Sequence, residues 1–107
     1  MIDRPAPPPP HEITTRIDWE AVRDEATQAL SEYVKLDSSH PVGRTVETAR
    51  LIADRLAAEG IESRTYETPD PNKVNLVARL SAKDPVGKAL VLSSHMDVVQ
   101  ALSLIHI

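Results

Sequence analysis

Cysteine and phenylalanine are both absent from this chain of 107 residues, and its only aromatic side chains are Trp19, Tyr33 and Tyr66. Without cysteine the chain cannot form a disulfide, a thiolate zinc site or a cysteine nucleophile. With so few aromatic residues, a core has to be built from Leu, Val, Ile and Ala, which bury less area per residue. We therefore expect marginal stability, and the lack of cysteine fits a reducing compartment.

Long apolar runs and clusters of basic residues are missing as well. No stretch approaches the roughly 20 apolar residues that a membrane-spanning helix needs, and the amino terminus lacks the apolar core of a secretory signal. The net charge is −4, and the twelve Lys and Arg residues are scattered, so they form no basic stripe of the kind that tracks phosphates. The sequence predicts a cytoplasmic protein with neither a nucleic-acid nor a membrane partner.

Proline is concentrated at the amino terminus, with five residues at positions 5, 7, 8, 9 and 10. Such a run favours extended polyproline conformations. A disordered leader over residues 1–16 is the preferred interpretation, and a ligand for a proline-binding module is the alternative. We predict a folded region over residues 17–101. The abrupt apolar tail, residues 102–107, is interpreted as non-native or truncated.

Two amphipathic helices are predicted from apolar residues that recur every three or four positions. The first begins after Asp18, a good N-cap, and ends near Leu36. The second runs from Thr45 to Glu59, and Gly60 follows where a left-handed C-terminal cap is wanted.

Three strands are predicted after the helices, over residues 61–67, 74–80 and 89–92. The third is a continuous apolar run, Ala-Leu-Val-Leu, typical of a strand that is buried on both faces. This strand needs cover on both faces, and only two helices are available to cover it. The simplest explanation is a central strand whose neighbours in the sheet lie downstream. The fold class predicted is therefore α/β, with a chain that stops within the domain.

His95 and Asp97 follow the third predicted strand and are the candidate chemical groups. In extended backbone, residues two positions apart point to the same side, roughly 6.5 Å apart. Ligands bind at the carboxyl ends of strands in open α/β sheets, where an imidazole can hold zinc and a carboxylate can orient it. From the spacing alone, an ordinary surface or hydrogen-bonded pair is the preferred interpretation, and a metal site is the alternative.

The segment from Ser93 to Val99, Ser-Ser-His-Met-Asp-Val-Val, resembles the first metal-binding motif of the dinuclear zinc aminoacylase and carboxypeptidase family. That family includes acetylornithine deacetylase, succinyl-diaminopimelate desuccinylase and glutamate carboxypeptidases. Family members often have Pro where this chain has Gln100. Similarity extends over roughly residues 18 to 101, in the same order along the chain, through the helix from Trp19, the Asp37–Pro41 loop, the Leu56–Ile61 helix end and Asn75–Ala78.

The resemblance implies a zinc-peptidase-like α/β/α catalytic domain that cleaves amide or peptide bonds of small acylamino acids or peptides. His95 matches the first zinc ligand, and Asp97 matches the acidic residue that holds this imidazole and is counted as catalytic. Two zinc ions per active site are implied, with cobalt as a substitute, and a homodimer is compatible with the full-length protein. The remaining ligands and the general base would lie downstream, so we expect this fragment to be inactive alone.

Two further interpretations concern His40 and the chain as a whole. His40 lies in a loop before Pro41 and is predicted to be solvated, although this region can lie near the substrate in the family. A serine-hydrolase triad of Ser94, His95 and Asp97 is excluded, because triad groups must approach from different segments. The alternative function is a small non-catalytic α/β interaction module whose Pro-rich arm binds a partner.

Overall fold

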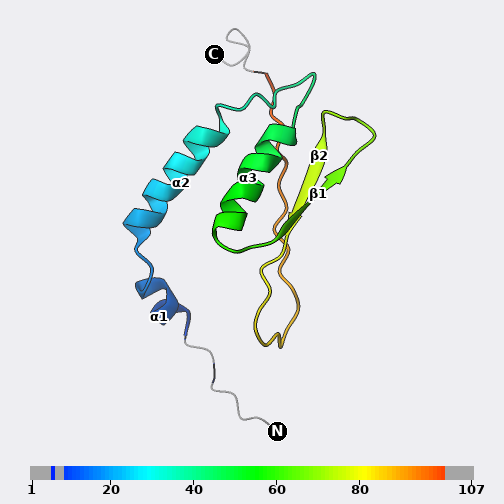
Figure 1. Ribbon diagram of the computed structural model, residues 1–107. Helices are drawn as coiled ribbons and strands as arrows, with labels where there is room; N and C mark the ends of the chain where they lie inside the picture. Colours follow the sequence, from blue (N-terminus) through cyan, green and yellow to red (C-terminus); the bar gives the residue numbers. More distant parts are fainter. Residues whose placement is uncertain (1–5, 7–8, 101–107) are drawn as a thin grey trace. The chain divides into compact units, whose positions relative to one another are not determined.

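The computed structural model describes residue 6 and residues 9–100, and its contacts divide the chain into two units between Glu32 and Tyr33. The first unit contains helix α1, Pro10–Thr15, and nearly all of helix α2, Trp19–Tyr33 (Figure 1). The second contains helix α3, Val46–Ala58, and strands β1, Ser63–Glu67, and β2, Val74–Ala78. Most of the predicted Pro-rich leader before residue 9, and the predicted tail over residues 102–107, lie outside the described residues.

Helix α1 lies inside residues 1–16, the segment that the sequence analysis interprets as a disordered leader. The helix begins at Pro10, directly after the extended residue Pro9. Proline is well tolerated at this first position because the N–H that it lacks would have no partner within the helix. Pro10 is thus compatible with the first position of the helix and does not prevent it.

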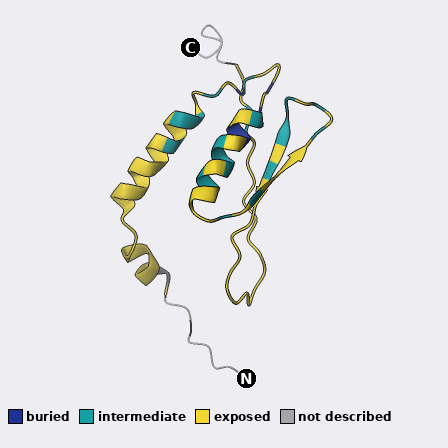
Figure 2. Cartoon of the chain, viewed as in Figure 1, coloured by how far each residue is buried: buried dark blue, intermediate teal, exposed yellow. Residues whose placement is uncertain are grey.

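Helix α2 confirms the predicted N-cap at Asp18. The Asp18 carboxylate accepts a hydrogen bond of 3.0 Å from the backbone N–H of Ala21, which satisfies one of the free donors at the helix start. The helix ends at Tyr33, three residues before the predicted end. None of its residues is buried (Figure 2). Trp19 and Leu30, for example, are 58% and 62% exposed.

Helix α3 confirms the second predicted helix, together with its glycine cap. Gly60 has φ 71°, the left-handed conformation that glycine adopts without a steric penalty. Its N–H donates to the carbonyl of Ala57, and the Ile61 N–H donates to that of Leu56, at 3.0 and 2.9 Å. This pair of bonds is the Schellman arrangement, which satisfies carbonyls at the helix end.

Strands β1 and β2 form an antiparallel hairpin that packs against α3 (Figure 1). The register pairs Ser63 with Ala78 and Glu67 with Val74. Val74 and Leu76 are half-buried while Val77, between Leu76 and Ala78, is exposed. One face of the hairpin therefore covers the helix and the other faces outward, as the alternation of side chains in a strand requires.

The best-buried part of the second unit is mostly polar and lies around the start of α3. Ser38, Thr45, Thr48 and Ala49 are only 1–6% exposed. The Thr45 hydroxyl accepts a bond from the Val74 N–H at 2.8 Å and donates to the Val74 carbonyl at 3.1 Å. The Thr45 side chain thus links the helix start to β2. Its hydroxyl acts both as a donor and as an acceptor, as expected for a buried hydroxyl.

The predicted third strand, residues 89–92, is not formed among the described residues. Leu90, Val91 and Leu92 are 85%, 80% and 88% exposed, and no strand pairs with them. An extended segment becomes a strand only when a neighbouring chain satisfies its backbone groups. The prediction of a buried central strand is therefore wrong for this structure, although the apolar character that prompted it is real.

The coarse class of helices with a sheet is confirmed: the second unit combines a helix with a two-stranded antiparallel sheet. Among the described residues, no helix combines the length and the apolar character that crossing a membrane requires.

Candidate functional site

Two segments that are far apart in the sequence meet at the candidate site. Ser39 and Val98 form an isolated parallel bridge. The His40 N–H donates to the Val98 carbonyl at 2.9 Å, and the Val98 N–H donates to the Ser38 carbonyl at 3.1 Å. The loop after α2 therefore holds the segment that carries His95 and Asp97.

The carbonyl of Met96 is held from a second direction. It accepts hydrogen bonds from the Tyr33 hydroxyl at 2.7 Å and from the Ser38 hydroxyl at 2.9 Å. Burial, followed by the negative charge of Asp97, raises the pKa of Tyr33 above its usual value. Tyr33 therefore stays protonated at neutral pH and keeps its role as donor.

The shape of the loop before Pro41 depends on Asp37. Its carboxylate accepts bonds from the Ser39 hydroxyl at 2.6 Å and the Ser39 N–H at 3.1 Å. These bonds lower the pKa of Asp37; slight burial opposes this lowering, and the positive charge of Arg44 adds to it.

The loop turns again at Gly43, where φ is 60°. A Cβ at Gly43 would lie 3.3 Å from Lys73 Cε and 3.7 Å from Asp97 Cβ, so glycine allows the loop to approach the site closely.

Asp97 lies between two imidazoles. Its Oδ2 is 3.0 Å from Nε2 of His40, and its Oδ1 is 3.3 Å from Nδ1 of His95. The same His95 nitrogen is 2.7 Å from the backbone carbonyl oxygen of Asp97. Partial burial raises the pKa of Asp97, but the hydrogen bonds from His40 and from its own backbone, together with the two imidazoles' charge, lower it further than burial raises it. The carboxylate is thus ionised at neutral pH and able to hold both rings.

The partners determine which ring nitrogens carry hydrogen. A backbone carbonyl and a carboxylate only accept hydrogen bonds, so Nδ1 of His95 and Nε2 of His40 are the donors. In its neutral form His95 therefore keeps a free lone pair on Nε2, and its side chain is 83% exposed. This is the arrangement of an imidazole ready to ligate a metal, because metal-binding histidines usually donate their other N–H to a carbonyl or a carboxylate.

The sequence-based site prediction can be compared with this arrangement residue by residue. His95 and Asp97 lie in direct contact, as their spacing suggested, but in an unpaired segment and not at a strand end. His40 is 51% exposed, as predicted for a solvated loop residue, and it also contacts Asp97, which was not predicted. No local signal could have revealed this contact, because it joins residues 57 positions apart.

Zinc is the metal that the family resemblance implies, and the chemistry of the available donors is the test of its fit. Catalytic zinc sites take about three protein ligands and a water. No group of three or more His, Cys, Asp or Glu residues is gathered for a metal in the part of the chain that the structure describes. His95 fits one ligand position, with Asp97 beside it, and further ligands would have to come from elsewhere.

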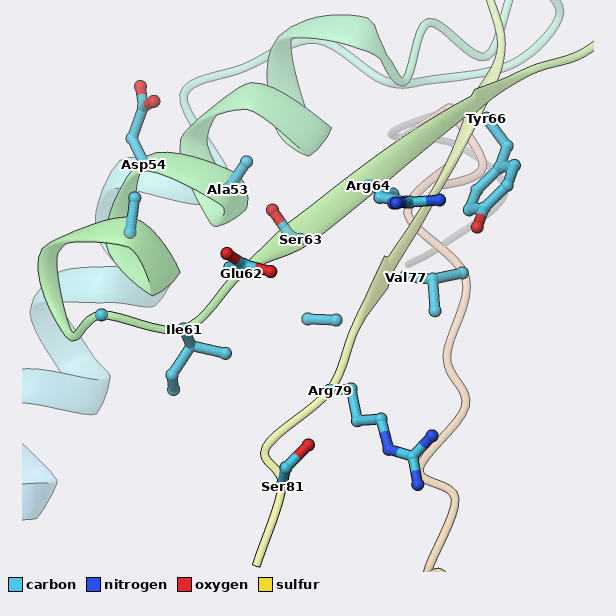
Figure 3. Close-up of a pocket in the computed structure, with 13 residues that line it drawn as sticks. Ala53, Asp54, Ile61, Glu62, Ser63, Arg64, Tyr66, Val77, Arg79 and Ser81 are labelled. Atoms are coloured by element: carbon cyan, nitrogen blue, oxygen red, sulfur yellow. The ribbon is translucent and has the colours of Figure 1, made fainter.

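One pocket lies away from these residues. It has a volume of about 730 Å³ and lies between the end of α3 and the hairpin, and neither His40, His95 nor Asp97 lines it. Figure 3 shows Asp54 and Ala53 projecting from α3, and Arg64 and Arg79 extending from the hairpin side. Its lining carries charges of both signs and no histidine, and it is not part of the candidate site.

Comparisons with known proteins add no assignment. A scan against models of protein families matched none, and searches of curated proteins and of solved structures found no match. The resemblance to the dinuclear zinc hydrolases therefore rests on the sequence motifs alone.

Proposed function

We propose that this chain is the N-terminal part of a zinc-dependent hydrolase of amide or peptide bonds, with His95 as a metal ligand and Asp97 as the residue that orients it. One observation carries the proposal: His95 Nδ1 lies 2.7 Å from the Asp97 backbone carbonyl oxygen and 3.3 Å from Asp97 Oδ1, while the His95 side chain is exposed and leaves Nε2 free to bind a metal. The substrate class is a small acylamino acid or peptide, and its identity is set by residues outside this chain.

The exposed apolar segment supports the view that further polypeptide completes the domain. Leu90, Val91 and Leu92 are each at least 80% exposed, and such a run with free backbone groups is a template for pairing with another strand. Strands added on each side would bury it and would bring further ligands to the end that carries His95.

When bound, zinc would lower the pKa of a water molecule and polarise the scissile carbonyl. Within this chain the contribution is limited to one imidazole and its support. Asp97 holds the ring through Nδ1, the Met96 carbonyl is held by Tyr33 and Ser38, and His95 Nε2 is left for the metal. The general base and the other ligands would come from downstream residues.

The test is to express the product of the complete gene and to measure bound zinc and hydrolysis of N-acylated amino acids and dipeptides. We expect His95→Ala to lose activity and zinc from one of two positions. Asp97→Asn should retain the fold while metal affinity or activity falls about 10–100-fold. His11→Ala is the matched control, because His11 lies exposed in α1 and should leave both measurements unchanged.

Full activity with normal zinc in the His95→Ala protein would refute the proposal. A gene product that binds no zinc and hydrolyses nothing would favour the second candidate, a non-catalytic interaction module. The exposed segment 90–92 would then be the surface on which a partner chain adds a strand.

A further inference from the structure

The loop before Pro41 contributes a side chain to the candidate site that no local pattern predicts. We propose that His40 is a positioning residue for His95, acting through the Asp97 carboxylate. This inference deepens the proposed function and depends on it for its purpose, but the contacts that carry it are properties of this chain alone.

The carboxylate of Asp97 is divided between the two rings. His40 takes Oδ2 at 3.0 Å, which leaves Oδ1 facing His95 Nδ1 at 3.3 Å. The terminal torsion of an aspartate is broad and has no sharp minima, so without the bond from His40 the carboxylate would be held less firmly. His40 therefore keeps Oδ1 beside His95 Nδ1, where it adds to the 2.7 Å bond to the Asp97 backbone carbonyl in favouring the Nδ1–H tautomer of His95.

His40 is itself held in place by the segment that it supports. Its backbone N–H donates to the Val98 carbonyl at 2.9 Å, one residue beyond Asp97. The Asp37 carboxylate fixes the preceding residue, Ser39, through two bonds, and the Gly43 N–H closes the turn on the Ser39 carbonyl at 2.9 Å. The main chain of His40 is thus bonded to Val98, while its side chain is bonded to Asp97.

His40 is not itself placed as a metal ligand. Its Nε2 is engaged by Asp97, and no group of three metal-binding side chains is found among the described residues. Its effect on a metal would pass through Asp97 and His95. Outer partners of this kind fix the tautomer and the ring orientation of a ligand.

Two substitutions distinguish a positioning role of His40 from the effect of any polar side chain at this position. In His40→Gln the side-chain amide nitrogen takes the place of Nε2 and can still donate to Asp97. In His40→Asn the amide nitrogen takes the place of Nδ1 and falls short of the carboxylate. The readout is the ring ¹⁵N chemical shifts of His95 in the metal-free 107-residue chain near pH 8, above the ordinary histidine pKa of about 6.5. Zinc chloride titration, followed by the same His95 signals, is the second readout.

We expect His40→Gln to keep the Nδ1–H tautomer of His95 and a near-normal zinc response. His40→Asn should shift His95 toward the other tautomer and weaken its zinc binding by about tenfold, the low end for the loss of such a partner. The amide exchange of Val98, which is bonded to the Ser38 carbonyl, reports whether the loop is intact and should be unchanged in both variants.

Wild-type tautomer and zinc response in His40→Asn would overturn the inference. So would equal losses in the two variants, or lost protection of Val98 in His40→Asn, because His40 would then act only by building the loop. The proposed hydrolase function fails on different evidence, namely zinc and activity retained by His95→Ala in the complete gene product. Each idea can thus fail without the other.

Discussion

Replacing Thr45 by Val should uncouple the start of helix α3 from strand β2. The two side chains have nearly the same shape, so the change removes a hydroxyl and adds a methyl group. Thr45 is 6% exposed, and its hydroxyl makes both a donated and an accepted bond with the backbone of Val74. The substitution leaves the Val74 N–H and carbonyl without these partners in a nearly dry place.

The magnitude follows from that loss. Leaving a buried donor or acceptor unsatisfied costs about 1–3 kcal/mol. Helix capping adds nothing, because the Thr45 side chain makes no cap bond to α3. Thr45→Ser is the matched control: it keeps the hydroxyl and loses one methyl group, for which the cost is about 0.8 kcal/mol.

The measurement is urea unfolding followed by far-ultraviolet circular dichroism, together with amide hydrogen exchange at Val74. Trp19 lies in the first unit, so its fluorescence would not report on this contact. A loss of about 1–3 kcal/mol corresponds to exchange roughly 5–150-fold faster at Val74 in Thr45→Val. The reasoning would be refuted if Thr45→Val exchanged at the wild-type rate, or if Thr45→Ser lost as much stability as Thr45→Val.

Two further predictions concern Gly60 and Asp37. Gly60→Ala should cost about 1 kcal/mol in urea unfolding, because its φ of 71° strains any L-residue while no atom lies within 4 Å of the new Cβ. Gly87→Ala, equally open but without a positive φ, should cost none. Asp37 should titrate below its ordinary pKa in a carboxyl ¹³C NMR titration, and Ser39→Ala should raise that pKa toward the ordinary value. Since the folded pKa is the lower one, the stabilisation is complete above the unfolded pKa of about 3.9 and is lost as the pH falls through the folded value; an unshifted Asp37 would contradict the loop geometry.

The proposed roles of His95 and His40 differ in how they can be tested. The role proposed for His95 is to bind a metal that other segments would help to hold, so its decisive test needs the complete gene product. His40 concerns a tautomer within this chain, so its test needs no metal and no substrate.

Local interactions explain which elements could be predicted from the sequence. The start of α2 depends on Asp18 and the residues that follow it at once, and the end of α3 depends on Gly60 and the preceding turn. The positions of β1 and β2 followed from the residues within each strand and from Pro69 and Pro71, which lie between them. Each of these signals involves residues only a few positions apart, so the sequence by itself determined these elements to within a few residues.

Tertiary structure decided what depends on distant partners. The bond between His40 and Asp97 spans 57 positions, and the pairing of Thr45 with Val74 spans 29, so neither leaves a trace in local spacing. The apolar segment 89–92 has the composition of a buried strand, yet backbone groups form a strand only when a neighbour meets them. The sequence thus determined α2, α3, the positions of β1 and β2 and the proximity of His95 to Asp97. The fold alone decided that a third side chain, His40, joins them, because only folding brings the two loops together.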